Sequence, residues 1–350
     1  MCMQENRGRK RKKCQSGMEE KWAIAAEDGI SVPGISRLIS NVWDTQDLVS
    51  RRGYEFYSAL RERSTNYGNL IQTITIPLED GKCFEGSYIN PMALMFYATG
   101  SCAKYGKFLQ LWFNGRVGKL CFHIDAAELG TMIAPSPGRE FQSISYTFAE
   151  LPSWYRARET GYIPFGILPA ELVDGKNMSP TFRVILDIFF SEYDFNLETL
   201  GVRIEVTDAA GRKYDYCLHA KYEAICADEK ALKEVASTKG AAGFKCCQKC
   251  TNCYNGDPAA VGDMVHYRDP DMRKFRNATP AIYNCMADRL SELASVGCSK
   301  GEFSATETAF GLKYNPDGVL WDKRVREIAR IPDTIYYDWH WPGSPVRTLK

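Results

Sequence analysis

The chain has 350 residues, of which 45% are hydrophobic and 25% charged, ordinary values for a protein that buries a core. The net charge of +1 excludes no class of partner, because charge can be segregated along the chain. No apolar run reaches the roughly 18 residues that a membrane span needs, and the N-terminus lacks the apolar segment of a signal peptide. The 13 cysteines are odd in number and clustered, which favours reduced thiols or metal ligands in an intracellular protein.

Residues 1–18 are predicted to form a disordered basic arm, because residues 7–13 are almost all Arg and Lys. Such a run is typical of a nuclear-import signal or a phosphate-binding tail, and a solvated terminus without a partner is the alternative. Residues 19–90 are predicted to be a mainly helical N-terminal region with a short strand at 70–76. Residues 91–114 are apolar and fit either a helix or a strand.

A regular series of elements begins near Lys119. Alternation of apolar residues predicts a strand that ends at Asp125, and a long strand at 213–227 ends just before Asp228. Between them the pattern predicts a loop at 135–138, strands at 143–148, 162–168 and 201–206, and a helix that starts with Ser179 as N-cap and Pro180 at its first position. A further helix is predicted at 229–239, ended by Gly240.

The resulting order of strands and helices resembles an RNase H-like core, for which we assign residues 91–245. In that fold the first strand and a later central strand bring two carboxylates together, and a later helix supplies a third. We therefore expect an α/β protein in which an RNase H-like mixed sheet has flanking helices, a helical N-terminal region and a zinc-knuckle-like insertion.

Four cysteines lie close together directly after this core, in the string CCQKCTNC. Cys247 and Cys250 have the two-residue spacing that lets both thiolates reach one tetrahedral zinc ion. Cys253, Cys246, His266 and Cys285 are the candidates for the other ligands. A redox pair or chance clustering is the alternative to structural zinc. We assign residues 246–350 to a Cys-rich insertion and a helical C-terminal part, in which Thr279 and Gly297 bound a helix.

Several strings carry a resemblance to a known family: FHIDAAELGTMIAPSPGREFQSISYTFAELPSWYRAR, GVRIEVTDAAGRKY, ICADEKALKEVASTKGAAGFKCCQKCTNC, FGLKYNPDGVLWDKRVR and IYYDWHW. Over roughly residues 85–340 the chain resembles the transposase-like proteins of dinoflagellates, which are similar to cut-and-paste DNA transposases of the CACTA type. The resemblance implies Asp125 and Asp228 as catalytic metal ligands for Mg²⁺ or Mn²⁺, and Cys247 and Cys250 as ligands of structural Zn²⁺. It also implies DNA as the partner, nuclear localisation, and allows a homo-oligomer.

The chain departs from the family pattern at two places. Ala126 follows the first acid where the family has another acid, and the third acid is expected on a helix beyond Asp338 and Trp339. We therefore expect a truncated or inactive copy, which cleaves and transfers DNA strands by two-metal chemistry only if it is active. The alternatives are a non-enzymatic nuclear zinc-containing DNA-binding protein and a product without a selected function.

The two acids also have simpler explanations. Asp228 precedes a helix, where Asp commonly serves as an N-cap, and Asp125 is explained equally well as a turn residue at a strand end. Asp338 is a further candidate for the third acid, although adjacent residues of a strand point in different directions.

Overall fold

The computed structural model describes residues 62–78, 81–131, 134–156, 161–170, 175–208, 210–255 and 263–337. The predicted basic arm, most of the predicted helical N-terminal region and Asp338 lie outside these residues. The chain divides into two compact units. Within the described ranges, no helix combines the length and the apolar character that crossing a bilayer requires.

The first unit contains the described part of residues 1–70, together with 90–118 and 201–219. Residues 91–114, ambiguous in the sequence, form two helices, and Asn90 caps the first by accepting the N–H groups of Met92 and Ala93. Gly106 lies so close to β8 that a Cβ there would stand 2.1 Å from the Glu205 carbonyl oxygen. The elements are α5 (Pro91–Ser101), α6 (Ala103–Phe113) and the antiparallel pairs β1 (Ser64–Thr65) with β2 (Gly68–Asn69) and β8 (Val202–Thr207) with β9 (Lys213–Leu218).

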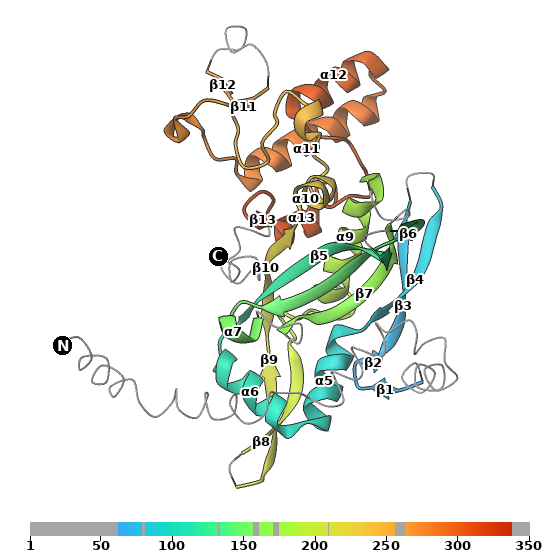
Figure 1. Cartoon of the computed structure of the whole chain (residues 1–350), viewed down its shortest axis with the longest axis vertical. Helices are drawn as coiled ribbons and strands as arrows, with labels where there is room; N and C mark the ends of the chain where they lie inside the picture. Colours follow the sequence, from blue (N-terminus) through green and yellow to red (C-terminus); the bar gives the residue numbers. More distant parts are fainter. Residues whose placement is uncertain are drawn as a thin grey trace, which may run out of the picture. The chain divides into compact units, whose positions relative to one another are not determined.

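The second unit is built on a five-stranded mixed sheet with the order β13-β10-β5-β6-β7 (Figure 1). β6 is antiparallel to both β5 and β7, whereas β10 and β13 are parallel. The strands are β5 (Gly118–Thr131), β6 (Ala134–Phe148), β7 (Ile163–Pro169), β10 (Ala220–Ala227) and β13 (Ile335–Tyr337). The prediction of a loop at 135–138 is wrong, because these residues extend β6 along β5.

The predicted strand at 213–227 is two strands. β9 ends at Leu218 and pairs with β8 in the first unit, whereas β10 begins at Ala220 and belongs to the five-stranded sheet. The alternation of apolar residues runs through His219 without interruption, so the sequence pattern contains no mark of the change in pairing partner. Tyr214, which shares the apolar phase, is exposed on this hairpin.

The core of the second unit lies between the sheet and helix α9 (Met178–Phe189). The buried ring of Phe122 on β5 packs edge-on against Phe182 and Phe189 of this helix, with centroids 5.5 and 5.1 Å apart. The helix begins one residue before Ser179, whose hydroxyl does not cap it but accepts the N–H of Val319. The hairpin of β3 (Ile71–Pro77) and β4 (Cys83–Ile89) packs on the same unit.

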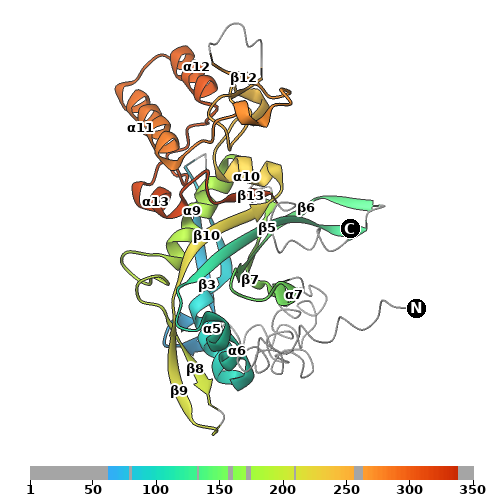
Figure 2. The ribbon, with the colours of Figure 1, turned by 90° about the vertical axis from the view of Figure 1, so that its left-hand side faces the viewer.

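A long segment separates β10 from β13 and contains most of the remaining helices (Figure 2). The prediction of a helix after Thr279 is confirmed: Thr279 accepts the N–H of Ile282, and Gly297 ends the helix with φ of 69°. Helix α10 is shorter than predicted, since it ends at Val235. The elements are α10 (Glu229–Val235), β11 (Cys253–Tyr254), β12 (Val265–His266), α11 (Pro280–Val296), α12 (Lys300–Phe310) and α13 (Lys323–Ala329), with α7 (Ser153–Arg156) earlier in the unit and short 3₁₀ turns at Gly175–Asn177, Gly240–Ala242 and Met272–Lys274.

Candidate functional site

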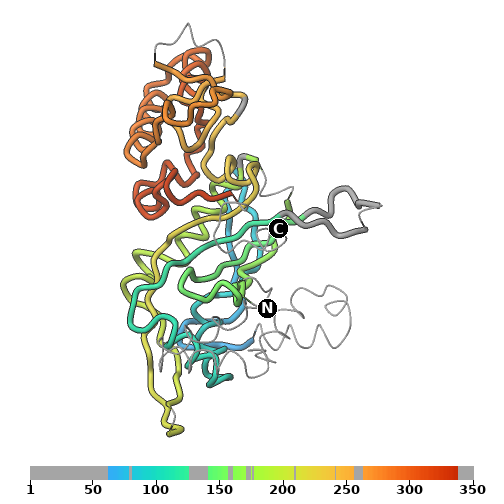
Figure 3. The backbone as a smooth tube through the Cα atoms, turned by 60° about the vertical axis from the view of Figure 1, so that its left-hand side comes forward, coloured from blue at the N-terminus to red at the C-terminus, as the bar shows by residue number. Residues whose placement is uncertain are grey.

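Of the two predicted catalytic acids, one lies on a strand of the sheet and the other directly follows the neighbouring strand. Asp125 is on β5, opposite Ser143 of β6, and Asp228 is the residue that follows β10. β5 and β10 are direct neighbours in the sheet, and the tube in Figure 3 follows their paths. Both aspartates are exposed.

Both acids also belong to the face of the sheet that α9 does not cover. Phe122 faces α9, so Cys121 beside it points to the opposite face, where it packs with Cys226 of β10. Asp125 is four residues beyond Cys121 on β5, and Asp228 is two residues beyond Cys226. Because side chains alternate along a strand, the even spacing keeps the Asp125 carboxylate on the face of the two thiols. Asp228 lies beyond the end of β10, but its extended backbone, with φ of −65° and ψ of 168°, continues the alternation from Cys226.

β10 departs once from strict alternation just before the site. Glu223 pairs with Lys119 on the face opposite α9, with Nζ and Oε1 3.1 Å apart. Cys226 lies on this same face although it is an odd number of residues further along. Asp228 therefore shares the phase of Cys226 and not that of Glu223.

Asp228 is an N-cap, as its position before a helix predicts. Its Oδ1 accepts the N–H of Ala231 at 2.7 Å and thereby satisfies one of the unpaired donors of the first turn of α10. A carboxylate has a second oxygen, and within the described chain no hydrogen bond to Oδ2 is seen. The cap and a metal contact are therefore compatible, because they use different oxygens.

No third acid joins this pair in the described part of the chain, where no three His, Cys, Asp or Glu side chains are arranged to hold a metal ion. Glu150, the nearest acid to the end of the second core strand, accepts the backbone N–H of Lys119 at 2.9 Å at the start of β5. Asp338 lies outside the described residues. The described site is therefore a pair of carboxylates.

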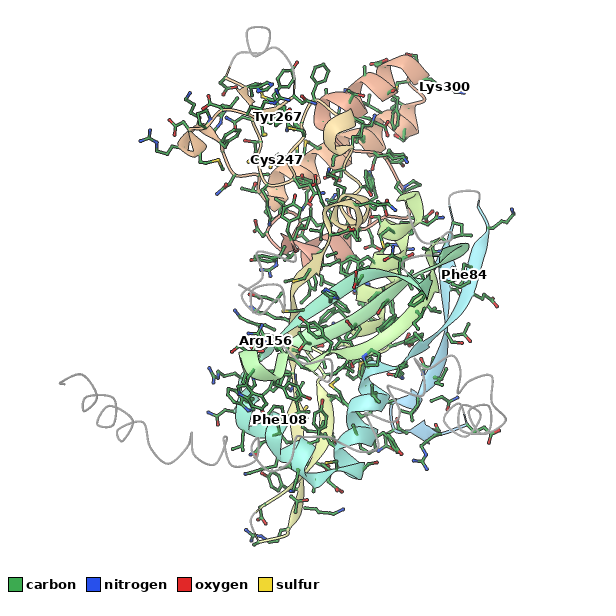
Figure 4. All side chains as sticks on the ribbon, viewed as in Figure 1. Phe84, Phe108, Arg156, Cys247, Tyr267 and Lys300 are labelled. Carbon is green, nitrogen blue, oxygen red and sulfur yellow. The ribbon has the colours of Figure 1, made fainter. Side chains whose placement is uncertain are left out.

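The cysteine cluster is the second candidate site, and Figure 4 labels Cys247 within it. The Sγ atoms of Cys246 and Cys253 are 3.6 Å apart. The pKa of Cys247 is lowered because the Cys250 thiol hydrogen-bonds to it, and because the backbone N–H groups of Lys249 and Cys250 do the same. The pKa of Cys250 is raised, first because its proton is held by Cys247 and second because the group is desolvated.

These contacts connect the four thiols in series: Cys250 with Cys247, Cys247 with Cys253, and Cys253 with Cys246. The loop that carries them is held by backbone bonds to the segment before α11. Ala278 donates to the Lys249 carbonyl, and Thr251 donates to the Arg276 carbonyl, each at 2.8 Å. Cys246, one of the candidates for the other zinc ligands, therefore belongs to the thiol cluster.

Two other candidate ligands are not brought to the thiols. His266 pairs with Tyr254 across β11 and β12, so it alternates away from the side on which Cys253 and Val265 lie. Its Nδ1 accepts the N–H of Arg268 at 3.2 Å, and its ring lies against Tyr267. Cys285 is exposed on α11.

The structure also reveals a concave site that the sequence did not indicate. Lys233 and Lys239 line it together with Lys313, which lies more than 70 residues further along the chain. Single lysines carry no spacing signal, and only the packing of the loop after α10 against the loop after α12 brings them together.

Comparison of the sequence with protein-family models and with curated proteins finds no match.

Proposed function

We propose that the chain is a transposase-derived protein that acts on DNA phosphodiesters, with Mg²⁺ or Mn²⁺ held by Asp125 and Asp228. The observation that carries the proposal is that Asp125 lies on β5 and Asp228 directly follows β10, its neighbour in the sheet. Carboxylate oxygens are the ligands that both ions prefer. A bound ion supplies charge stabilisation at the phosphate and lowers the pKa of a bound water.

The strand order supports an RNase H-like core. Counted along the chain, the five strands lie in the order fifth, fourth, first, second, third, with α9 between the third and fourth strands and α10 between the fourth and fifth. An RNase H-like sheet has this order, and it places a first-strand acid beside the end of the fourth strand. In such a core Asp125 and Asp228 would fill those two positions.

We also propose that the cysteine cluster binds Zn²⁺ as a structural ion. With Zn–S bonds of about 2.3 Å, two sulfurs of a tetrahedral site stand about 3.8 Å apart. The 3.6 Å between Cys246 and Cys253 fits that edge. The donated N–H groups at Cys247 favour the thiolate, which is the form that binds metal. Among the described residues no three such side chains surround one point, so the proposed zinc site would form by movement of the thiols toward the ion.

Elemental analysis of the purified protein tests the zinc proposal. We expect one zinc per chain, lost in Cys247→Ser and retained in Cys285→Ser, which changes an exposed thiol outside the cluster. Purified protein without zinc, or zinc that persists in Cys247→Ser, contradicts the zinc proposal. Neither result bears on the separate proposal that Asp125 and Asp228 hold Mg²⁺ or Mn²⁺.

A non-enzymatic DNA-binding protein is the second candidate function. The observation that favours it is the lack of a third carboxylate beside Asp125 and Asp228 within the residues that the structure describes. In this case the fold holds DNA and no strand is cut. Binding of this kind is largely electrostatic and weakens steeply with salt.

A nicking assay on supercoiled plasmid separates the two functions. With Mn²⁺ or Mg²⁺ we expect nicking by the wild type, loss of nicking in Asp125→Asn and in Asp228→Asn, and none in EDTA. Glu302→Gln, which neutralises an exposed acid of α12, is the matched control and keeps the activity. Nicking that survives Asp228→Asn in a folded protein refutes the proposed enzyme, whereas salt-sensitive DNA binding without any nicking supports the second function.

A further inference from the structure

Lys249, which lies between Cys247 and Cys250 in the loop of the thiols, reaches across to the last strand of the five-stranded sheet. Its side chain is half-buried, so the ammonium needs partners within the protein. It donates to the Pro332 carbonyl, with Nζ and the oxygen 2.5 Å apart, and lies 5.1 Å from the centre of the Tyr336 ring. The face of an aromatic ring attracts a cation. Lys249 therefore contacts both β13 and the turn that leads into it.

β13 depends on contacts of this kind because it is short. It has three residues, which pair in parallel with Ile225, Cys226 and Ala227 of β10 (Figure 1). A parallel ladder of this length contains few hydrogen bonds, and just before it Ile225 donates to the Thr334 carbonyl at 2.8 Å. Lys249 adds side-chain contacts to a strand that its own backbone holds weakly.

The pairing of β13 with β10 ends directly beside Asp228. Tyr337 is the partner of Ala227, and Asp228 is the next residue. β10 lies between β13 and β5, the strand that carries Asp125. Contacts on both edges of β10 therefore fix the position of Asp228 relative to Asp125. A binding constellation works when its groups are held to within about 0.5 Å of the productive geometry.

The same loop also holds the far end of α10, the helix that Asp228 caps. Gln248 is 2% exposed, and its Nε2 donates to the Thr238 hydroxyl at 3.0 Å. Thr238 follows α10 and donates its N–H to the Lys233 carbonyl at 2.8 Å. The carbonyl of Gln248 accepts the hydroxyl of the buried Tyr283 on α11 at 3.0 Å. Consecutive residues of the loop thus contact, directly or through Thr238, both elements that flank Asp228: the strand beside β10 and the helix after it.

We propose that Lys249 is a positioning residue for the Mg²⁺ or Mn²⁺ site, an inference that rests on the proposed function. By holding β13 against β10, Lys249 keeps the Asp228 carboxylate beside that of Asp125. It acts through the strand and is not a ligand of the ion. Removal of a group that contacts a metal ligand directly typically costs 10–100-fold in metal affinity. Lys249 acts from one strand further away, so its removal has a smaller effect.

Electron paramagnetic resonance of Mn²⁺ tests this inference without measuring activity, because the signal of the free ion falls as the ion binds. We expect Lys249→Met, which keeps the apolar stem and removes the charge, to raise the Kd for Mn²⁺ about three- to tenfold. Lys249→Arg can still donate to the Pro332 carbonyl and stack on Tyr336, so its Kd should lie within about twofold of the wild type. Lys245→Met is the matched control, since Lys245 is a half-buried lysine of the same segment that reaches Met286 of α11, at 3.7 Å.

Urea unfolding in EDTA separates positioning from stability. A residue with a purely structural role lowers the unfolding free energy and leaves the Kd of the folded protein unchanged, which is the result expected for Lys245→Met. A raised Kd in Lys249→Met that Lys249→Arg restores supports positioning. If Lys249→Met, folded by circular dichroism, binds Mn²⁺ like the wild type, the inference is overturned while the proposed metal site stands.

Two further results complete the test. If the wild type binds no Mn²⁺, or if Asp228→Asn binds it equally well, the proposed function fails and this inference fails with it. If Lys249→Met does not fold, Tyr336→Leu removes the same ring contact from the side of β13. A Kd equal to that of the wild type in folded Tyr336→Leu then overturns the inference.

Discussion

Asp228 is predicted to serve two purposes that substitution can separate. Asp228→Ala removes the cap of α10 and the proposed metal ligand, whereas Asp228→Asn keeps a good capping side chain and removes the charge. The cap bond of 2.7 Å to the Ala231 N–H is well formed, and Leu232 of the same helix is fully buried, so loosening this helix affects the core. We expect Asp228→Ala to lower the free energy of unfolding by about 1 kcal/mol without metal, and Asp228→Asn by a few tenths.

Adding the metal gives the second half of the prediction. An ion that binds the folded state at ten times its dissociation constant stabilises it by about 1.4 kcal/mol. We expect Mn²⁺ to raise the wild-type unfolding free energy in urea by this amount and to leave both Asp228 variants unchanged. Asp125→Asn should also lose the response to Mn²⁺, but without a capping cost, because Asp125 lies on a strand.

Urea titrations followed by far-UV circular dichroism, with EDTA or with Mn²⁺, measure both effects. If Asp228→Asn keeps the full response to Mn²⁺, the metal binds elsewhere and the reasoning about the two strands fails. If Asp228→Ala and Asp228→Asn are equally stable in EDTA, the cap contributes nothing and only the charge matters.

Three further predictions concern stability. Phe122→Ala should cost about 3–5 kcal/mol in urea, because its ring is buried against α9; a cost below 1 kcal/mol contradicts the core assignment. Gly106→Ala should lower the melting temperature, since its Cβ meets the Glu205 carbonyl; an unchanged value contradicts that close approach. Arg326 holds the pKa of Asp288 below its usual range, so Asp288→Asn should cost about 0.5 kcal/mol at pH 7. In unfolding titrations this difference should shrink as the pH falls below about 4, and a constant difference refutes the ion pair.

Local signals predicted the elements that carry the candidate site. The alternation that ends at Asp125 and the acid before α10 are visible in the sequence, and both acids end up on β5 and directly after β10. Thr279 and Gly297 bound α11 as expected, because capping depends on nearby residues. The sequence could not show which strands pair with each other in the sheets. The change of sheet at His219 and the extension of β6 through 135–138 depend on which strand lies alongside, which periodicity does not encode.

The residues of the candidate site are also brought together by pairings that the sequence pattern does not encode. That Asp125 and Asp228 are neighbours follows from β10 lying beside β5, a pairing between segments about 100 residues apart. His266 and the thiols are close in sequence, yet the pairing of β11 with β12 turns the imidazole away. The concave site lined by Lys233, Lys239 and Lys313 needs two distant loops to meet, so no spacing rule would have found Lys313.

The pairing of β13 with β10 has a consequence for synthesis on the ribosome. Ile225 and Ile335 are partners, and the difference between these positions is 110 residues. At translation rates of about 5–20 residues per second, the outer edge of β10 waits roughly 5–20 s for its neighbour. During that interval the nascent chain presents an open row of backbone donors and acceptors, the kind of edge to which other strands adhere. A chaperone that shields this edge would improve the yield of folded protein more than one that acts after release.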